Sequence, residues 1–287
     1  MDSDDVFSEY RPLLFSIAYE ILGSVADAED VVQESYLRWR AVDPDTVQNP
    51  RAYLARIVTR QALNSLRSAS RRREDYVGPW LPEPLDTSAD GAEHVLTGEA
   101  VTTAMLLVLE TLSPTERAVF VLREVFEFGY PEIARAVEKS EAAVRQIAHR
   151  ARAHVHARRQ TAVARPEEAR TVAERFFAAI ATGELQELMD LLAPDVVYLG
   201  DGGGVVSAGA RPVHGSAKVG RLVHGLFTKG ARLGEVGMSF GVYNGMPAWV
   251  VTLDGELDNV TCIEVRDGQV TGIYTVRNPE KLAALRH

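Results

Sequence analysis

The spacing of apolar residues changes once along this 287-residue chain, close to Pro166, and that change limits the fold more than any other feature. Before Pro166, apolar residues recur at three- and four-residue steps, which is typical of amphipathic helices. After two further helical segments the pattern alternates, and 17 of the 22 glycines lie in 166–287. Tight hairpin turns are predicted at Asn244-Gly245, Asp254-Gly255 and Asp267-Gly268. The sequence therefore predicts two all-α domains followed by an α+β domain with a curved antiparallel sheet.

Four segments follow from these patterns. Residues 1–75 are predicted to be helical, and residues 76–112 begin as a proline-rich linker and end in a short helix. Residues 113–165 hold three further helices, and residues 166–287 form the α+β domain. The net charges of the four segments are −3, −6, +4 and −4, which sum to the −9 of the whole chain. Because only the third segment is basic, a polyanion should contact the chain mainly there.

Composition excludes several classes of protein. The longest purely apolar run, residues 104–109, is far shorter than the roughly 20 residues of a membrane helix. The N-terminus is acidic and lacks the basic and apolar regions of a signal peptide. Cys262 is the single cysteine, so no intrachain disulfide can form, and its place in an alternating strand predicts a core thiol. We expect a cytoplasmic protein that makes no membrane contact.

The third segment has the pattern of a helix-turn-helix. Ser113 and Glu116 form the signature of a capping box, and helices are predicted at about 114–126, 131–138 and 141–160. The second helix of such a motif enters the DNA major groove, where arginine pairs with guanine and glutamine with adenine. A solvated basic face is the alternative, since the turn at Glu138-Lys139 lacks the usual glycine. The candidate DNA contacts are Arg145, Gln146, His149, Arg150 and Arg152.

A second basic stripe lies in the first segment, on the helix predicted from Asn49-Pro50 to about Ser70. Its members are spaced four, four, three and four residues apart, so they share one helical face. They are Arg56, Arg60, Asn64, Arg67 and Arg71. Such a stripe suits nucleic-acid phosphates, although a solvated face is equally compatible with the pattern. Tyr36, Trp39 and Tyr53 could stack on unpaired bases or could belong to the core.

Three stretches carry a family resemblance. "DAEDVVQESYLRWRA", "NPRAYLARIVTRQALNSLRSASRRRE" and "LSPTERAVFVLREVFEFGYPEIARAVEKSEAAVRQIAHRARAHV" stand in this order along the chain. They resemble regions 2 and 4 of an extracytoplasmic-function (ECF) RNA polymerase sigma factor, over roughly residues 3–75 and 110–160. The first stretch is the most specific, through Asp27, Glu29, Asp30, Gln33, Glu34, Tyr36 and Trp39.

The resemblance implies partners and roles. Core RNA polymerase and promoter DNA would be the partners, with docking to the β′ clamp helices through Asp30, Gln33 and Glu34. The arginine stripe, from Arg56 to Arg71, would contact the melted −10 element. Region 4 would read the −35 element through the third-segment candidates and would meet the β flap. The acidic linker would occupy the RNA exit path of the polymerase.

Residues 166–287 resemble a SnoaL-like domain, a cone of curved sheet packed by helices. Three short motifs resemble those of the sigma factors fused to such a domain, in which the extension regulates the sigma domains in cis. They are Trp80, Leu81, Pro82, Glu83 and Pro84; Asp201, Gly202, Gly203 and Gly204; and Asn278, Pro279, Glu280, Lys281 and Leu282. Val205 stands where the related motif continues with lysine. The glycine-rich turn could press against a neighbouring segment such as the linker.

Two other functions remain open at this point. The chain could be a ligand-responsive DNA-binding regulator that works without polymerase. The cone could instead host an enzyme, with general acid/base candidates at Tyr198, Asp201, His214, Asp254 and Arg277. Each of these lies near a predicted turn or strand end, where solvated polar residues are normal. We predict no metal and no cofactor, and a small molecule in the cone is a possible partner.

Overall fold

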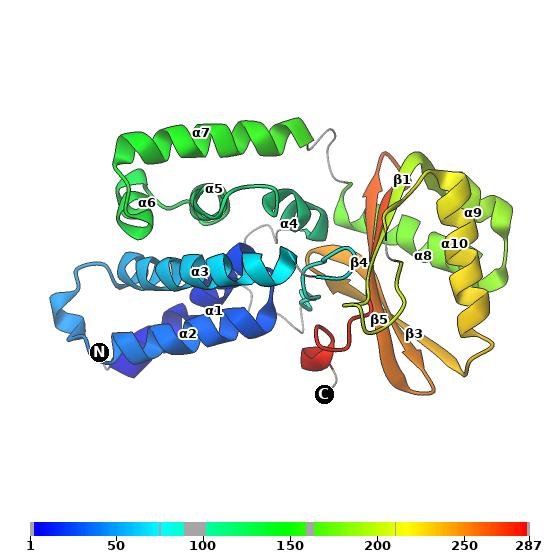
Figure 1. The fold of residues 1–287 in the computed structure, drawn as a ribbon, viewed down its shortest axis with the longest axis horizontal. Coiled ribbons are helices and arrows are strands. Elements are labelled where there is room, and N and C mark those ends of the chain that lie inside the picture. Colours follow the sequence, from blue (N-terminus) through cyan, green and yellow to red (C-terminus); the bar gives the residue numbers. More distant parts are fainter. Residues whose placement is uncertain (1–2, 75, 89–101, 159–163, 210, 286–287) are drawn as a thin grey trace. The chain divides into compact units, whose positions relative to one another are not determined.

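The computed structural model describes residues 3–74, 76–88, 102–158, 164–209 and 211–285. These residues form two compact units. The helical unit comprises the described residues of 3–74 and 105–158, and the cone unit comprises 76–88, 102–104, 164–209 and 211–285. Residues 76–88 of the predicted linker thus pack with the C-terminal domain (Figure 1). The finer division into four segments stays a prediction.

The first half of the helical unit consists of α1 (Ser3–Leu22), α2 (Val25–Trp39), the short η1 (Pro44–Thr46) and α3 (Pro50–Glu74). Gly23 ends α1 with a positive φ of 69°, a conformation that glycine adopts without steric cost. The Ser24 hydroxyl then caps α2 by accepting from the Asp27 N–H. Trp39 is fully buried and donates its indole N–H to the Ser3 carbonyl at 2.7 Å, so it belongs to the core.

The second half consists of α4 (Thr103–Leu109) from Met105 onward, α5 (Pro114–Phe120), the π-helical turn η3 (Val121–Val125), α6 (Tyr130–Val137) and α7 (Glu141–Arg158). The predicted capping box at Ser113 and Glu116 is confirmed. The helix expected over 114–126 is α-helical only to Phe120 and continues as η3. Residues 159 and 160, expected at the end of the last helix, lie outside the described residues. Residues 95–101 of the short helix expected before residue 112 also lie outside the described residues.

The cone unit packs α8 (Pro166–Thr182), α9 (Leu185–Leu191) and α10 (Ser216–Gly230) against a sheet (Figure 1). Its strands are β1 (Leu192–Asp201), β2 (Val213–His214), β3 (Val236–Tyr243), β4 (Met246–Leu253), β5 (Glu256–Arg266) and β6 (Gln269–Val276). In the described part of the chain they form one sheet in the order β2-β1-β6-β5-β4-β3. The sheet is mixed, because β1 pairs parallel to β6. The expectation of a wholly antiparallel sheet was wrong at this pair. Between β1 and β6 the chain forms β2, α10 and then the three antiparallel hairpins β3–β4, β4–β5 and β5–β6. The turn signals did predict these hairpins.

All three predicted hairpin turns are confirmed. Asn244, Asp254 and Asp267 have φ between 47° and 52°, and the glycine after each also has a positive φ. Two successive left-handed residues define the turn that matches the twist of a hairpin. The core between sheet and helices includes Phe176, Leu188, Val196, Ile263 and Ile273.

Cys262 on β5 is a buried core thiol, as predicted. Burial raises the pKa of the Cys262 thiol to about 12. We expect Ellman's reagent at pH 8 to modify the native chain about a thousandfold more slowly than the urea-unfolded chain, because the thiolate is the reactive form. Equal rates would show that the thiol is accessible.

Candidate nucleic-acid interface and linker anchor

Helix α7 presents a basic face to solvent. Val144, Ala148, Ala151 and Val155 are buried on one side of the helix. Arg145, Gln146, His149 and Arg150 are exposed on the other. The division into a buried and an exposed face follows the predicted helical wheel, and it leaves the candidate base-reading side chains at the surface.

Two arginines of α7 are positioned by neighbours from the same unit. The Arg145 guanidinium lies 4.4 Å from the centre of the Tyr130 ring and 3.8 Å from the Glu141 carboxylate. Arg152 donates to both carboxylate oxygens of Glu124, at 3.1 and 2.6 Å. Those bonds raise the pKa of Arg152 above its ordinary value. Because Arg152 is paired in this way, it offers less free charge to DNA than Arg145.

The arginine stripe on α3 has the predicted common face, but its members differ in their surroundings. Arg56 stacks on the Tyr53 ring with 4.6 Å between guanidinium and ring centre. Asn64 and Arg67 are exposed. Arg60 is bound to α6, as described below. Arg71 lies on α3, and its side chain is outside the described part of the structure.

The polymerase-docking candidates lie on the solvent side of α2. Asp30, Gln33 and Glu34 are all exposed, and Glu34 accepts a hydrogen bond from the Gln61 amide of α3. Leu37, one turn after Gln33 and Glu34, is 66% exposed. Leu37 was not among the docking candidates predicted from the sequence. Leu37 follows Gln33 by four residues and Glu34 by three, so its place on the same helical face could have been predicted.

The three motifs predicted from the sequence to be regulatory meet at one buried carboxylate. Asp201, at the end of β1, is fully buried and accepts from the Tyr76 hydroxyl, the Leu81 N–H at 2.9 Å and the Gly203 N–H at 3.0 Å. Lys281 lies 2.7 Å from the same carboxylate and also donates to the Leu81 carbonyl. We call this cluster of Tyr76, Leu81, Asp201, Asn278 and Lys281 the linker anchor.

Aromatic rings enclose the charged pair of the linker anchor. The Lys281 ammonium lies 4.1 Å from the centre of the Trp80 ring and 5.0 Å from that of Tyr76. The Asn278 amide donates to the Tyr76 hydroxyl at 2.9 Å. Burial, followed by the hydrogen bond to Asp201, raises the pKa of Tyr76 well above its usual range. Tyr76 therefore stays protonated and remains a hydrogen-bond donor.

The glycines after Asp201 allow this close approach. A Cβ at Gly203 would lie 2.4 Å from the Asn278 amide, and one at Gly204 would lie 2.9 Å from Val77 of the linker. A Cβ at Gly202 would lie 1.9 Å from the Val206 carbonyl oxygen. The interpretation that the turn presses against the linker is confirmed. Val205 is 69% exposed, and the cation of the anchor comes from Lys281.

A second contact ties the linker to the β3–β4 turn. The Asn244 side chain accepts from the Leu85 N–H at 3.0 Å and donates to the Glu83 carbonyl at 3.3 Å. Its backbone N–H donates to the Leu85 carbonyl at 2.9 Å. Sequence reasoning identified Asn244 only as a turn residue and missed this role. Leu81 and Leu282 are fully buried, and Pro82 and Pro84 are buried as well.

The five candidate acid/base residues do not meet at one site. Tyr198 and Arg277 line a cavity of about 210 Å³ in the cone, whereas Asp201 belongs to the linker anchor. His214 and Asp254 are exposed. Burial of Asp201 corrects the expectation of a solvated carboxylate. Within the described ranges, no three His, Cys, Asp or Glu side chains are grouped so that they could hold a metal ion.

Two family models match the first 155 residues of the chain in part. The family model for sigma-70 region 2 matches residues 6–72, and that for sigma-70 region 4 matches residues 102–155. These matches define a protein of the sigma-70 class. The ECF RNA polymerase sigma factor SigJ of Mycobacterium tuberculosis is 41% identical over 291 residues, covering 96% of this chain and 91% of the relative. The chain therefore belongs to the family of ECF RNA polymerase sigma factors.

Two further comparisons agree. The probable ECF sigma factor SigI of M. tuberculosis is 29% identical, covering 96% of this chain and 93% of the relative. The crystal structure of M. tuberculosis SigJ superposes with a TM-score of 0.80 at 35% identity, covering 96% of this chain and 97% of that one. The helical sigma domains followed by a mixed-sheet cone are thus shared with a known sigma factor. Among the described helices, none has the length and apolar character needed to cross a bilayer.

Proposed function

We propose that this protein is the promoter-recognition subunit of RNA polymerase, which binds the core enzyme and directs it to start at defined promoters. The match to regions 2 and 4 in one chain is the observation that carries the proposal. A polymerase-independent regulator has no use for the exposed docking face of α2. We expect the protein to act in the cytoplasm, where core polymerase is, and to have no catalytic activity of its own.

Region 4 is proposed to read the −35 element through α7. Arg145, Gln146 and His149 lie toward the start of that helix, where a recognition helix contacts base edges. Arg150 and Arg152 suit the phosphates that flank those bases. The β flap of the polymerase is the proposed partner that holds region 4 at this position.

Arg145→Ala should weaken −35 preference by about 1–3 kcal/mol, because a bidentate arginine–guanine contact is lost. The measurement is holoenzyme binding to promoters with substituted −35 bases. Arg170→Ala is the matched control. Arg170 is paired with a glutamate four residues along and lies over a Phe240 ring, but on the cone. Equal discrimination by wild type and Arg145→Ala would remove Arg145 from the −35 contact.

Region 2 is proposed to hold the melted −10 strand through Arg56, Arg60, Asn64, Arg67 and Arg71. Guanidinium groups on one helical face can follow a phosphate backbone, and the Tyr53 ring beside Arg56 offers a surface for stacking. The face formed by Asp30, Gln33 and Glu34, with Leu37 at its end, is proposed to dock on the β′ clamp helices. Polar and acidic side chains around one exposed leucine suit a partner helix with basic residues and an apolar groove.

The cone is proposed to regulate the sigma regions in cis through the linker anchor. Residues 76–88 are bound by Asp201, Lys281 and Asn244. If the linker enters the RNA exit path in the holoenzyme, its bonds to the cone must break first. The strength of the anchor therefore sets how readily the free protein converts to the form that polymerase binds.

A small molecule in the cone is proposed as a further partner. The cavity is lined mainly by apolar side chains such as Phe176, Phe227 and Met238, and its polar lining includes Asn259 and the Asp258–Arg277 pair. A molecule with an apolar body and one polar edge fits such a lining. Its binding would act on the same domain that holds the linker.

The test uses purified full chain with and without core polymerase on genomic promoter fragments. We expect a footprint over −35 and −10 positions only when core polymerase is present. A footprint from the chain alone, unchanged by core polymerase, would favour the polymerase-independent regulator instead.

A further inference from the structure

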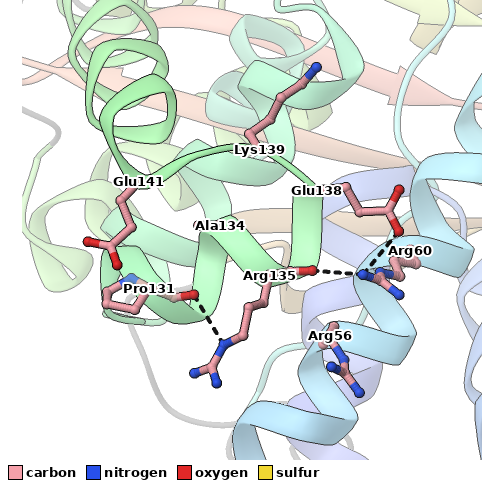
Figure 2. Close-up of a pocket in the computed structure, with 8 residues that line it drawn as sticks. All are labelled: Arg56, Arg60, Pro131, Ala134, Arg135, Glu138, Lys139 and Glu141. Atoms are coloured by element: carbon pink, nitrogen blue, oxygen red, sulfur yellow. Dashed lines mark hydrogen bonds and ion pairs between the residues drawn. The ribbon is translucent and has the colours of Figure 1, made fainter.

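Arg60, in the middle of the arginine stripe, is held by the end of helix α6. Its guanidinium donates to the Arg135 carbonyl at 2.9 Å and lies 3.0 Å from the Glu138 carboxylate (Figure 2). The Arg135 carbonyl belongs to the last turn of α6. Main-chain acceptors in this turn lack helical partners, and the negative end of the helix dipole lies here. Both oxygen acceptors contact the same terminal nitrogen of the Arg60 guanidinium, and a phosphate oxygen that bound this nitrogen would have to replace them.

Glu138 has a left-handed backbone conformation, which is unfavourable for a residue other than glycine. It ends α6 with a φ of 56°, and the N–H groups of Glu138 and Lys139 both donate to the Ala134 carbonyl. These bonds fix the left-handed conformation, in which glycine is usual at a helix end. The sequence thus places a carboxylate where glycine would be unstrained, and that carboxylate pairs with Arg60.

Neighbouring contacts cover the start of the same helix α3. Arg51 donates to the Phe126 carbonyl at 3.1 Å and lies over the Phe128 ring at 4.2 Å. The Asn49 amide donates to Glu132 at 3.4 Å. The groove beside Arg60 is also lined by Arg56, Arg135, Lys139 and Glu141 (Figure 2). Region 4 therefore contacts region 2 directly on the face assigned to the −10 strand.

We propose that Glu138 and the end of α6 act as an internal substitute for a DNA phosphate, which occupies Arg60 in the free protein. This inference rests on the proposed function, in which Arg60 contacts the melted −10 strand. Arg60 cannot bind α6 and a phosphate at once. Separation of regions 2 and 4 on the polymerase would free Arg60 where the −10 strand is melted, so the free protein is kept from gripping single strands elsewhere.

The test measures binding of a fluorescein-labelled, mixed-sequence single-stranded DNA 12-mer to the full chain without polymerase. Glu138→Gly removes the carboxylate and relieves the left-handed residue. Glu127→Gly is the matched control, because Glu127 is exposed, has a φ of 57° and does not line the groove. Arg60→Ala and the double variant Arg60→Ala/Glu138→Gly complete the set.

We expect Glu138→Gly to bind the strand about two- to fivefold more tightly than wild type, the range of an exposed ion pair, because the hydrogen bond from Arg60 to the Arg135 carbonyl remains. The gain should shrink as salt rises. Glu127→Gly should match wild type, and the gain should vanish in the Arg60→Ala background. A gain equal to that of Glu127→Gly, or one that persists without Arg60, would overturn the proposal.

A parallel assay of open-complex formation by holoenzyme separates this inference from the proposed function. If Arg60→Ala slows opening while Glu138→Gly leaves free-chain binding unchanged, Arg60 contacts DNA and the α6 contact does not compete. If Arg60→Ala alters neither assay, the −10 role of Arg60 fails, and the substitute phosphate fails with it.

Discussion

Asp201→Ala should lower the free energy of unfolding of the cone unit by about 3–5 kcal/mol, because it leaves the Lys281 ammonium buried without its counter-charge. The Tyr76 hydroxyl and the N–H groups of Leu81 and Gly203 lose an acceptor at the same time. We expect residues 76–88 to exchange their amide hydrogens faster in this variant. Urea unfolding and hydrogen exchange of the full chain measure the two effects.

Two control variants show whether the loss belongs to the linker anchor. Asp195→Ala removes an exposed carboxylate of the same strand β1 and should cost far less. Adding Lys281→Met to Asp201→Ala removes the unpaired charge and should restore part of the stability, since the two residues are in contact. If Asp201→Ala and Asp195→Ala unfold at the same urea concentration, the anchor contributes little.

Charge reversal on the exposed face of α2 should have the second large effect. Asp30→Arg with Glu34→Arg should weaken binding to core polymerase at least about tenfold, because like charges placed across an interface cost several kcal/mol. Both side chains are exposed, so the fold should tolerate the change, which removes the hydrogen bond from the Gln61 amide to Glu34. The measurement is competition for labelled core enzyme at fixed salt.

The matched control reverses Asp5 and Glu9, two exposed acids of α1. This double variant carries the same change in net charge away from the predicted docking face. We expect the α2 variant to lose more affinity for core polymerase than the α1 variant. Equal binding by wild type and the α2 variant would mean that polymerase docks elsewhere.

Local patterns predicted most of the elements. The Ser113 cap, the three Asn-Gly and Asp-Gly turns and the buried face of α7 depend on neighbours in sequence, and all appear where expected. The parallel pairing of β1 with β6 joins residues some 75 positions apart, as in Val197 with Gly272, and no local signal specifies it. The π-helical turn after Phe120 likewise interrupts a pattern that looked continuous.

The linker anchor was predictable only in part. Three motifs pointed to four of its five residues and missed Tyr76, and they could not show that Asp201 is buried or that Lys281 is its counter-charge. The partners Tyr76 and Lys281 lie 125 and 80 residues from Asp201 in sequence. Arg60 gives the opposite case. Its helical face was predicted, yet the contact with Glu138 depends on how two helical segments pack.

Run-off transcription with purified core polymerase decides whether this chain is a sigma factor controlled by its cone, in three parallel reactions: no added protein, the full chain, and a chain ended at residue 165. We expect the full chain to yield transcripts with defined start sites and loss of the cone to change their amount severalfold. Transcripts that never depend on the added protein would contradict its role as a sigma factor. Equal output from both forms would contradict control by the cone.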